Sequence, residues 1–317
     1  MSSIVPHILK KSKSFVCIIQ VLFILGYNFF MKKYIITLLM LLSVNVTYAN
    51  EHFDFLNFNV FNRDTREIKS LLRSQVKYAN KTNFDKFIAT YDKDYTNSDG
   101  FNLETYSSLV KDIWNSYDKI VYGIKIKSIS VKDDTADVVV EETSSADIPI
   151  SAKMDGVLKS EADSVYHLKK NGGKWKVASD EVIKEVTSML YGDARNLDIK
   201  LTAPEKIKAG EEYTASLEFN PPTNVIAIAS IANDKVEYPQ KPAKEVYRKF
   251  PEDNILERIF ISNSDNVNEY VVASIGLTKA DIEDLNIKLS LTGFGYKIVR
   301  VNVIPVEVKE ENNDKNK

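Results

Sequence analysis

The spacing of apolar residues changes after Tyr117, and this change constrains the fold more than any other feature of the sequence. Before Tyr117, apolar residues recur every three or four positions, which predicts helices. The helices are expected over 64–79, 84–91 and 103–117. After Tyr117, apolar and polar residues alternate, which predicts strands. The strands are expected over 120–131, 136–143, 156–169 and 174–177. This order predicts an α+β unit, in which helices are followed by an antiparallel sheet.

Two details refine this first unit. From Ile120 to Ile126 the isoleucines occupy even-numbered positions, whereas Ile129 and Val131 occupy odd-numbered ones. The alternation of apolar and polar residues therefore shifts by one position at Lys127–Ser128. Such a shift predicts a β-bulge, which bends a sheet. After residue 177 helical spacing returns, and a helix is expected from Ser179 or Asp180 to Gly192.

The second half of the chain has a different pattern, with short apolar runs separated by turn residues. Seven strands are expected over 197–201, 212–219, 225–232, 255–261, 270–275, 287–292 and 296–303. Gly293-Phe-Gly is expected to be the turn between the last two. About seven short strands in one domain predict an antiparallel β-sandwich.

The first 49 residues contain five lysines and no acidic residue. Within them, Met31-Lys32-Lys33 followed by an apolar core and by Ala49 has the three parts of a secretory signal. Translation from Met31 with cleavage after Ala49 is therefore expected, and residues 1–30 are interpreted as an N-terminal extension. This predicts a periplasmic or secreted protein with no stable membrane span after cleavage. The alternative is an uncleaved signal that anchors the chain in the membrane.

Composition excludes several classes of function. Without residues 1–49 the chain has 268 residues, 37 basic and 44 acidic side chains, a charge of −7 and no cysteine. A single cysteine in the whole chain excludes a disulfide scaffold and a cysteine-rich metal site. Basic residues are interspersed with acidic ones, so no nucleic-acid partner is expected. Neither a phosphate-binding glycine loop nor a histidine pair with metal spacing is present, so no cofactor and no metal are expected.

These patterns divide the mature chain into four parts. An aromatic arm is expected at 50–63, an α+β domain at 64–192, a β-sandwich at 197–308 and a charged, disordered tail at 309–317.

The first domain resembles the NTF2-like family, including its SnoaL-like branch, over residues 66–185. The resemblance rests on Phe87-x3-Tyr91-x3-Tyr95 with Asp99-Gly100, on Trp114-x2-Tyr117, and on the closing run 161–177. It implies a cone whose helices wrap one face of a curved sheet, often around a pocket. The second domain resembles an immunoglobulin-like sandwich, but it lacks the Cys–Trp–Cys core of that family.

Aromatic residues of the first domain are the candidate site. Rings with polar groups can line a small apolar cavity, although aromatic residues more often simply fill a core. The candidates are Tyr91, Tyr95, Tyr106, Trp114, Tyr117 and Tyr122.

No catalytic residue is assigned from the sequence. The mature chain has only His52 and His167, and His167 falls on the polar side of its strand. Asp92, Asp94 and Asp99 flank a polar loop, where solvated carboxylates are common.

The predicted function is therefore that of an exported, non-enzymatic binding protein. The cone is expected to hold a small apolar ligand or a partner segment, and the sandwich is expected to contact a protein partner. A homodimer is expected through the strand face of 136–143 and 156–169. The alternative is a periplasmic SnoaL-like isomerase or hydrolyase that uses an Asp/Tyr pair in the cone.

Overall fold

The computed structural model of the protein describes residues 58–151, 154–241, 244–283 and 286–305. The predicted signal at 31–49, most of the arm at 50–63 and the tail at 309–317 lie outside these ranges and stay predictions. Within them, most residues lie in strands.

Three helices precede the strands, as the apolar spacing predicts. They are α2 (Phe58–Ala79), α3 (Phe84–Ile88) and α4 (Leu103–Ser116). Asparagine side chains begin the two later helices. The Oδ1 atom of Asn83 accepts a hydrogen bond from the Lys86 amide (3.2 Å), and that of Asn102 accepts one from the Thr105 amide (2.9 Å). Helix α2 begins at Phe58, so it includes the last residues of the predicted arm.

One large, largely antiparallel sheet dominates the structure. Its strands lie in the order β1-β2-β3-β4-β12-β11-β8-β9, and β6 pairs with β12 outside this path. They are β1 (Val121–Lys132), β2 (Thr135–Asp147), β3 (Gly156–Asn171), β4 (Lys174–Gly192), β6 (Lys206–Lys208), β8 (Val225–Lys235), β9 (Arg248–Lys249), β11 (Glu269–Glu283) and β12 (Asn286–Ile304). A second sheet has the order β10-β7-β5. Its strands are β5 (Lys200–Thr202), β7 (Glu212–Glu218) and β10 (Ile255–Ile261).

The predicted bulge in the first strand is confirmed. The pairing of β1 with β2 shifts by one residue between Ile126 and Ser128, so Lys127 is the extra residue. The shift lets Ile126 and Ile129 both pack against the core on the helix side of the sheet, although their parities differ.

The helix predicted from residue 179 to 192 is wrong, because this segment continues strand β4 to Gly192. Both faces of this strand are covered. Met189 and Tyr191 belong to the core on the helix side, whereas Val186 and Leu190 pack against the core on the opposite side. Apolar residues on both faces of a strand give a spacing that imitates a helix, and the sequence alone could not separate the two.

The turn predicted at Gly293-Phe-Gly is also wrong, because β12 runs through it without a break. These glycines allow close approach between strands. A Cβ atom on Gly293 would lie 2.6 Å from the Ala194 backbone nitrogen, and one on Gly295 would lie 2.5 Å from a Leu190 methyl carbon. Gly293 pairs with Gly192 at the end of β4. The glycines therefore mark a tight contact between β4 and β12.

The pairing of β4 with β12 contradicts the predicted fold class. Seven register pairs, from Gly192–Gly293 to Val186–Val299, join strands of the two predicted domains into one sheet. The protein is thus a mostly β structure built on a large sheet with three helices in the described ranges, and not an α+β cone followed by an Ig-like β-sandwich. The proposed division into 64–192 and 197–308 stays a prediction, with one sheet extending across it.

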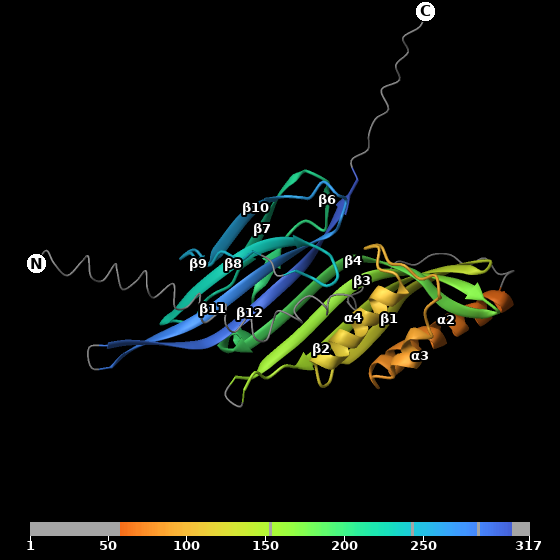
Figure 1. The fold of residues 1–317 in the computed structure, drawn as a ribbon, viewed down its shortest axis with the longest axis horizontal. Coiled ribbons are helices and arrows are strands. Elements are labelled where there is room, and N and C mark those ends of the chain that lie inside the picture. The colour runs from red at the N-terminus through yellow and green to blue at the C-terminus, as the bar shows by residue number, and fades with distance from the viewer. Residues whose placement is uncertain (1–57, 152–153, 242–243, 284–285, 306–317) are drawn as a thin grey trace, which may run out of the picture.

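Two cores lie on opposite faces of this sheet. The first lies between the helices and strands β1 to β4 and continues to Tyr270 and Tyr296 on β11 and β12. The second lies between the three-stranded sheet and strands β8, β11 and β12. Figure 1 shows α2, α3 and α4 beside the β1–β4 part of the sheet, with β7 and β10 beside the other part. In the described ranges, no helix combines the length and the apolar character needed to cross a membrane.

Replacing Gly293 by alanine tests the contact between β4 and β12. The new Cβ would meet backbone atoms of Ala194, Asp193 and Tyr191, which cannot rotate away. We expect Gly293→Ala to lower the free energy of unfolding by about 1–3 kcal/mol, measured by urea denaturation. Gly123→Ala on β1 is the matched control, because its Cβ would meet only the rotatable Thr143 hydroxyl. Equal losses for the two variants would contradict a tight joint at Gly293.

Candidate functional site

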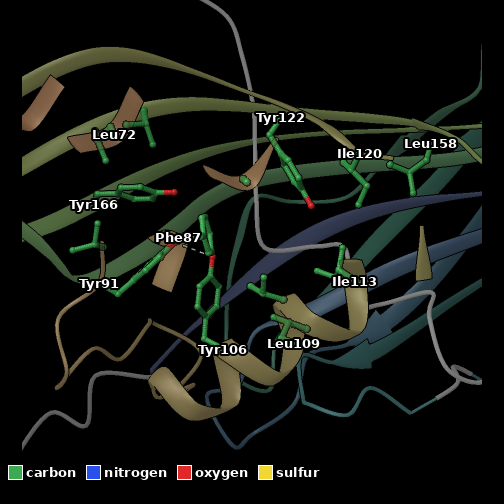
Figure 2. Close-up of a cluster of buried hydrophobic side chains, with 14 of the residues drawn as sticks. Leu72, Phe87, Tyr91, Tyr106, Leu109, Ile113, Ile120, Tyr122, Leu158 and Tyr166 are labelled. Atoms are coloured by element: carbon green, nitrogen blue, oxygen red, sulfur yellow. Dashed lines mark hydrogen bonds between the residues drawn. The ribbon is translucent and has the colours of Figure 1, made fainter. Parts of the chain in front are cut away.

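Aromatic side chains from the helices and the following loop form a packed cluster under the sheet (Figure 2). The ring of Tyr91 lies 4.9 Å from that of Tyr95 and 5.0 Å from that of Tyr106, measured between centroids. The rings of Tyr95 and Tyr106 are 5.4 Å apart. Phe87 lies beside them, with its ring 5.5 Å from that of Trp114. These separations are those of attractive aromatic pairs.

The hydroxyl groups of the cluster are hydrogen-bonded to one another or to carboxylates. The Tyr91 and Tyr106 hydroxyls are 2.9 Å apart. The Tyr95 hydroxyl donates to Oδ1 of Asp180 on β4. Tyr166 on β3 donates to Oε1 of Glu142 on β2, at 2.5 Å. The Tyr91–Tyr106 and Tyr166–Glu142 bonds are buried and the Tyr95–Asp180 bond is partly buried, and an unpaired hydroxyl is costly in such surroundings.

Burial determines the chemistry that these phenols can perform. It raises the pKa values of Tyr91, Tyr95, Tyr106 and Tyr166 well above the ordinary value of 10. The phenols therefore stay protonated at neutral pH and act as hydrogen-bond donors and acceptors, not as general bases.

Asp180 is the carboxylate of the cluster that can titrate near neutral pH. Burial raises its pKa to about 6, while the hydrogen bond from Tyr95 opposes this shift by stabilising the ionised form. The loop before α4 holds Asp180 in place from the outside, because the Ser98 amide donates to the Asp180 carbonyl at 2.9 Å. Asp180 therefore joins the aromatic cluster to the loop that carries Asp99.

A buried ion pair lies on the other side of this loop. Asp99 accepts two hydrogen bonds from the Arg300 guanidinium on β12, at 2.5 and 3.2 Å, and the two side chains are 1% and 0% exposed. Asn268 donates a third bond to Asp99, at 2.7 Å. Burial lowers the pKa of Arg300, but the Asp99 carboxylate and the other groups around it outweigh this and raise it above its ordinary value. The arginine is therefore charged, and its charge is compensated.

Glu185 on β4 lies in the same buried region. Burial raises its pKa well above the ordinary value of 4.5, although Arg300 opposes the shift. Its Oε2 atom is 3.5 Å from the Tyr270 hydroxyl, and its buried Oε1 atom has no hydrogen-bond partner among the described residues. Tyr270 and Arg300 come from β11 and β12, so this polar region connects the two halves of the chain.

The structure brings most of the aromatic residues expected from the sequence into one cluster. Tyr91, Tyr95 and Tyr106 are in mutual contact, and the Trp114 Nε1 atom donates to the Tyr122 hydroxyl at 3.0 Å. Tyr117 packs against the same core from the end of α4. Their expected role as the lining of a ligand pocket stays a prediction, since the contacts described are between the rings themselves.

Other residues of the region were missed or misread. Asp180 lies on strand β4 and not at the start of a helix. Asp92 and Asp99 are not solvated loop residues, since the Asp92 residue is 1% exposed and Asp99 is paired with Arg300. The signal for Arg300 was present, because it is a lone charge in the apolar run 298–304. His167 lies on the polar side, as expected, with Nδ1 2.6 Å from Asp137. In the part of the chain that the structure describes, no three His, Cys, Asp or Glu residues converge as a metal site would require.

One family of known proteins matches part of the chain. Residues 70–189 match a family described as the C-terminal domain of the anti-sigma-I factor RsgI9. The match covers α2 from residue 70, the two later helices and almost all of β1 to β4. A comparison with curated proteins found no match.

Solved structures add only distant likenesses. Bd1075 of Bdellovibrio bacteriovorus is 16% identical, with a TM-score of 0.32, over 41% of this chain and 44% of that one. The alpha-2-macroglobulin of Escherichia coli, activated by porcine elastase, is 10% identical, with a TM-score of 0.24, over 59% of this chain and 23% of that one. This chain therefore spans less than half of each of these proteins, and neither likeness supports a conclusion about the fold or the activity.

The family match overturns two expectations from the sequence. The resemblance to NTF2-like and SnoaL-like proteins is wrong as an assignment, because the model that matches the same region describes an anti-sigma factor domain. The function predicted from that resemblance, a cone for a small apolar ligand with a SnoaL-like isomerase as the alternative, is wrong for the same reason. The motifs on which the resemblance rested, such as Phe87-x3-Tyr91-x3-Tyr95, encode the packed aromatic cluster instead.

The pKa of Asp180 predicts how stability depends on pH. The folded state binds the Asp180 proton up to about pH 6, whereas the unfolded state releases it near 3.8. Between these values the folded state holds more protons, so the contribution of Asp180 to stability is lost as the pH rises toward and past 6. Asp180→Asn removes this loss and keeps an oxygen acceptor for Tyr95. We expect the stability of Asp180→Asn relative to wild type to improve by about 1–3 kcal/mol between pH 4.5 and 8.

Urea denaturation of both proteins at the two pH values measures this difference. Asp94→Asn is the control, because the Asp94 side chain, in the loop before α4, is 64% exposed. A pH response of Asp180→Asn equal to that of wild type would contradict the assignment of this titration to Asp180.

Proposed function

We propose that this protein is a regulator that acts by binding a protein partner, and that the partner is a sigma factor. The match of residues 70–189 to a domain of an anti-sigma-I factor carries the proposal. The chemistry of the buried cluster agrees with it, because the phenols of that region are protonated and engaged in packing and hydrogen bonds. A regulator of this kind needs a stable scaffold with a recognition surface. It does not need a reactive pocket.

The earlier partner expectations change accordingly. A protein partner is retained, whereas the family match gives no support to a small apolar ligand or to a homodimer through the β2 and β3 face. That face carries a ladder of opposite charges. Lys125 and Lys127 bind Glu141, and Lys127 also binds Asp163, with nitrogen–oxygen distances from 2.5 to 3.6 Å.

The position of the chain relative to the membrane bears on this function. Cleavage after Ala49 would release the described region from the compartment in which transcription takes place. An uncleaved anchor would leave residues 50–317 on that same outer side, so direct binding of a sigma factor by the described region requires that the apolar residues before Ala49 do not export it. N-terminal sequencing and fractionation of the protein from its host test this requirement, since a chain that begins at Asn50, or one recovered outside the cytoplasm, would contradict it.

Binding of a sigma factor is the direct test of the proposal. The full chain, tagged at its C-terminus, is co-expressed with each sigma factor of its source organism and purified in mild detergent. We expect one alternative sigma factor to co-purify at a fixed ratio and the housekeeping sigma factor to be absent. We also expect transcription from promoters of the bound factor to fall when the chain is overproduced.

Failure of every sigma factor to co-purify, together with unchanged transcription, would contradict the proposal. Arg300→Met is a useful companion variant, because it leaves Asp99 without its buried counter-ion and should unfold the scaffold. Loss of sigma binding in this variant would show that binding needs the folded region.

A further inference from the structure

Strand β10 forms an exposed edge of the three-stranded sheet. In the order β10-β7-β5 it pairs with β7 on one side, and no described strand pairs with its other side. Its side chains alternate sharply. Leu256 and Phe260 point into the second core, whereas Ile255, Ile259 and Ile261 are 41%, 60% and 67% exposed. Three branched apolar side chains thus lie in a row on the outer face of an edge strand.

The backbone groups of alternate residues on β10 face the open edge, although the Ile255 amide already donates to Oδ1 of Asp253 at 3.4 Å. The Ser262 amide donates to the Glu211 carbonyl, and the Phe219 amide donates to the Asn254 carbonyl. In an antiparallel pair the residues that exchange hydrogen bonds alternate, so the even-numbered residues of β10 bond to β7. The N–H and C=O groups of Ile255, Glu257, Ile259 and Ile261 therefore point away from β7, toward the open edge.

The other strand edges in the described ranges are protected more strongly than β10. Strand β1 carries a bulge and the paired lysines Lys125 and Lys127, which are devices that block unwanted strand pairing. Strands β5 and β9 contain only three and two residues. Strand β10 has seven residues without a bulge or a lysine, and its one basic residue, Arg258, points inward, where its guanidinium donates to the Ile231 carbonyl. An apolar edge of this kind is a liability for a protein unless a partner covers it.

The charge around β10 indicates what that partner carries. On β7 and β10, the outward positions include the acidic residues Glu212, Glu218 and Glu257 and no basic residue. Lys200 on β5 lies 4.0 Å from Glu218, at the far side of the sheet from the open edge. An added strand would therefore meet isoleucines at its ends and the Glu257 carboxylate between them. A lysine or arginine flanked by branched apolar residues fits this arrangement.

We propose that β10 is the docking edge for an extended segment of a protein partner, which adds to the sheet as a fourth strand next to β10. The segment carries a basic residue opposite Glu257 and branched apolar residues opposite Ile255 and Ile259. Main-chain hydrogen bonds supply affinity, and the side chains on the outer face supply specificity. This inference rests on the proposed function only in assuming that the partner is a protein.

A short synthetic peptide tests the docking edge. The probe is fluorescein-labelled Thr-Val-Thr-Lys-Thr-Val-Thr, which reads the same in both directions and so suits parallel or antiparallel addition. A second probe has glutamate in place of lysine. We expect the full chain to bind the lysine peptide at least fivefold more tightly than the glutamate peptide at low salt, measured by fluorescence anisotropy.

Two variants of β10 make the test specific. Glu257→Lys should reverse the preference between the two peptides. Ile259→Pro removes an N–H group that points to the open edge, so it should weaken both peptides at least tenfold while the pairing with β7 persists. Glu252→Lys is the control, because it makes the same charge change at a position that is 90% exposed outside β10. Circular dichroism checks that each variant folds.

Three results would overturn the inference. They are equal binding of both peptides to wild type and Ile259→Pro, an unchanged preference in Glu257→Lys, and a wild-type dimer that Ile259→Pro abolishes. The last result would make a second copy of the chain the occupant.

The same variants separate this inference from the proposed function. Weaker peptide binding in Ile259→Pro with sigma binding intact would keep the function and show that a protein other than the sigma factor occupies the docking edge. Peptide binding at β10 without any sigma binding would keep the docking edge and remove sigma as the partner.

Discussion

The pairing of β4 with β12 is the contact on which the rest of the structure depends. It joins strands from the two halves of the chain through seven register pairs and turns two sets of strands into one sheet. Gly293 and Gly295 permit the close approach at its end, where any larger residue would meet backbone or Leu190. One core lies on each face of this strand pair. Met189 and Tyr191 therefore pack in the first core, and Val186 and Leu190 pack against the second.

The buried polar region reinforces the same joint. Asp99 comes from a loop of the first half and Arg300 from β12, and neither side chain is exposed to water. Such a pair adds little net stability over apolar residues, but removing one partner leaves an uncompensated charge and costs several kcal/mol. The pair therefore makes incorrect docking of the loop on the sheet costly. Asp180 and Glu185 add carboxyl groups whose pKa values are raised by burial, so the region is sensitive to pH.

The local pattern of the sequence predicted individual helices and strands better than it predicted how the strands pair into sheets. Helices such as 103–117 and the bulge at Lys127 follow from short-range spacing, and the structure confirms them. The second half of strand β4 was predicted as a helix. Because both of its faces are buried, apolar and polar residues do not alternate along it as they do in a strand with one exposed face. The aromatic residues of the cluster could be found from their positions. Arg300 stands out as a lone charge in an apolar run, but its pairing with Asp99 joins residues 201 positions apart, and no local pattern predicts that partner. The sequence predicted a strand at 255–261, but it could not predict that this strand lies at the edge of its sheet, which is why its isoleucines are exposed.

Native-state hydrogen exchange tests the central claim, that one sheet extends through both halves of the chain. We expect the amides of 186–192 and 293–299 to exchange slowly and to share one opening free energy, close to that of global unfolding. The helices and the three-stranded sheet should then unfold in the same cooperative transition. Fast exchange across β4 and β12, with separate transitions for 64–192 and 197–308, would contradict the claim and restore two independent domains.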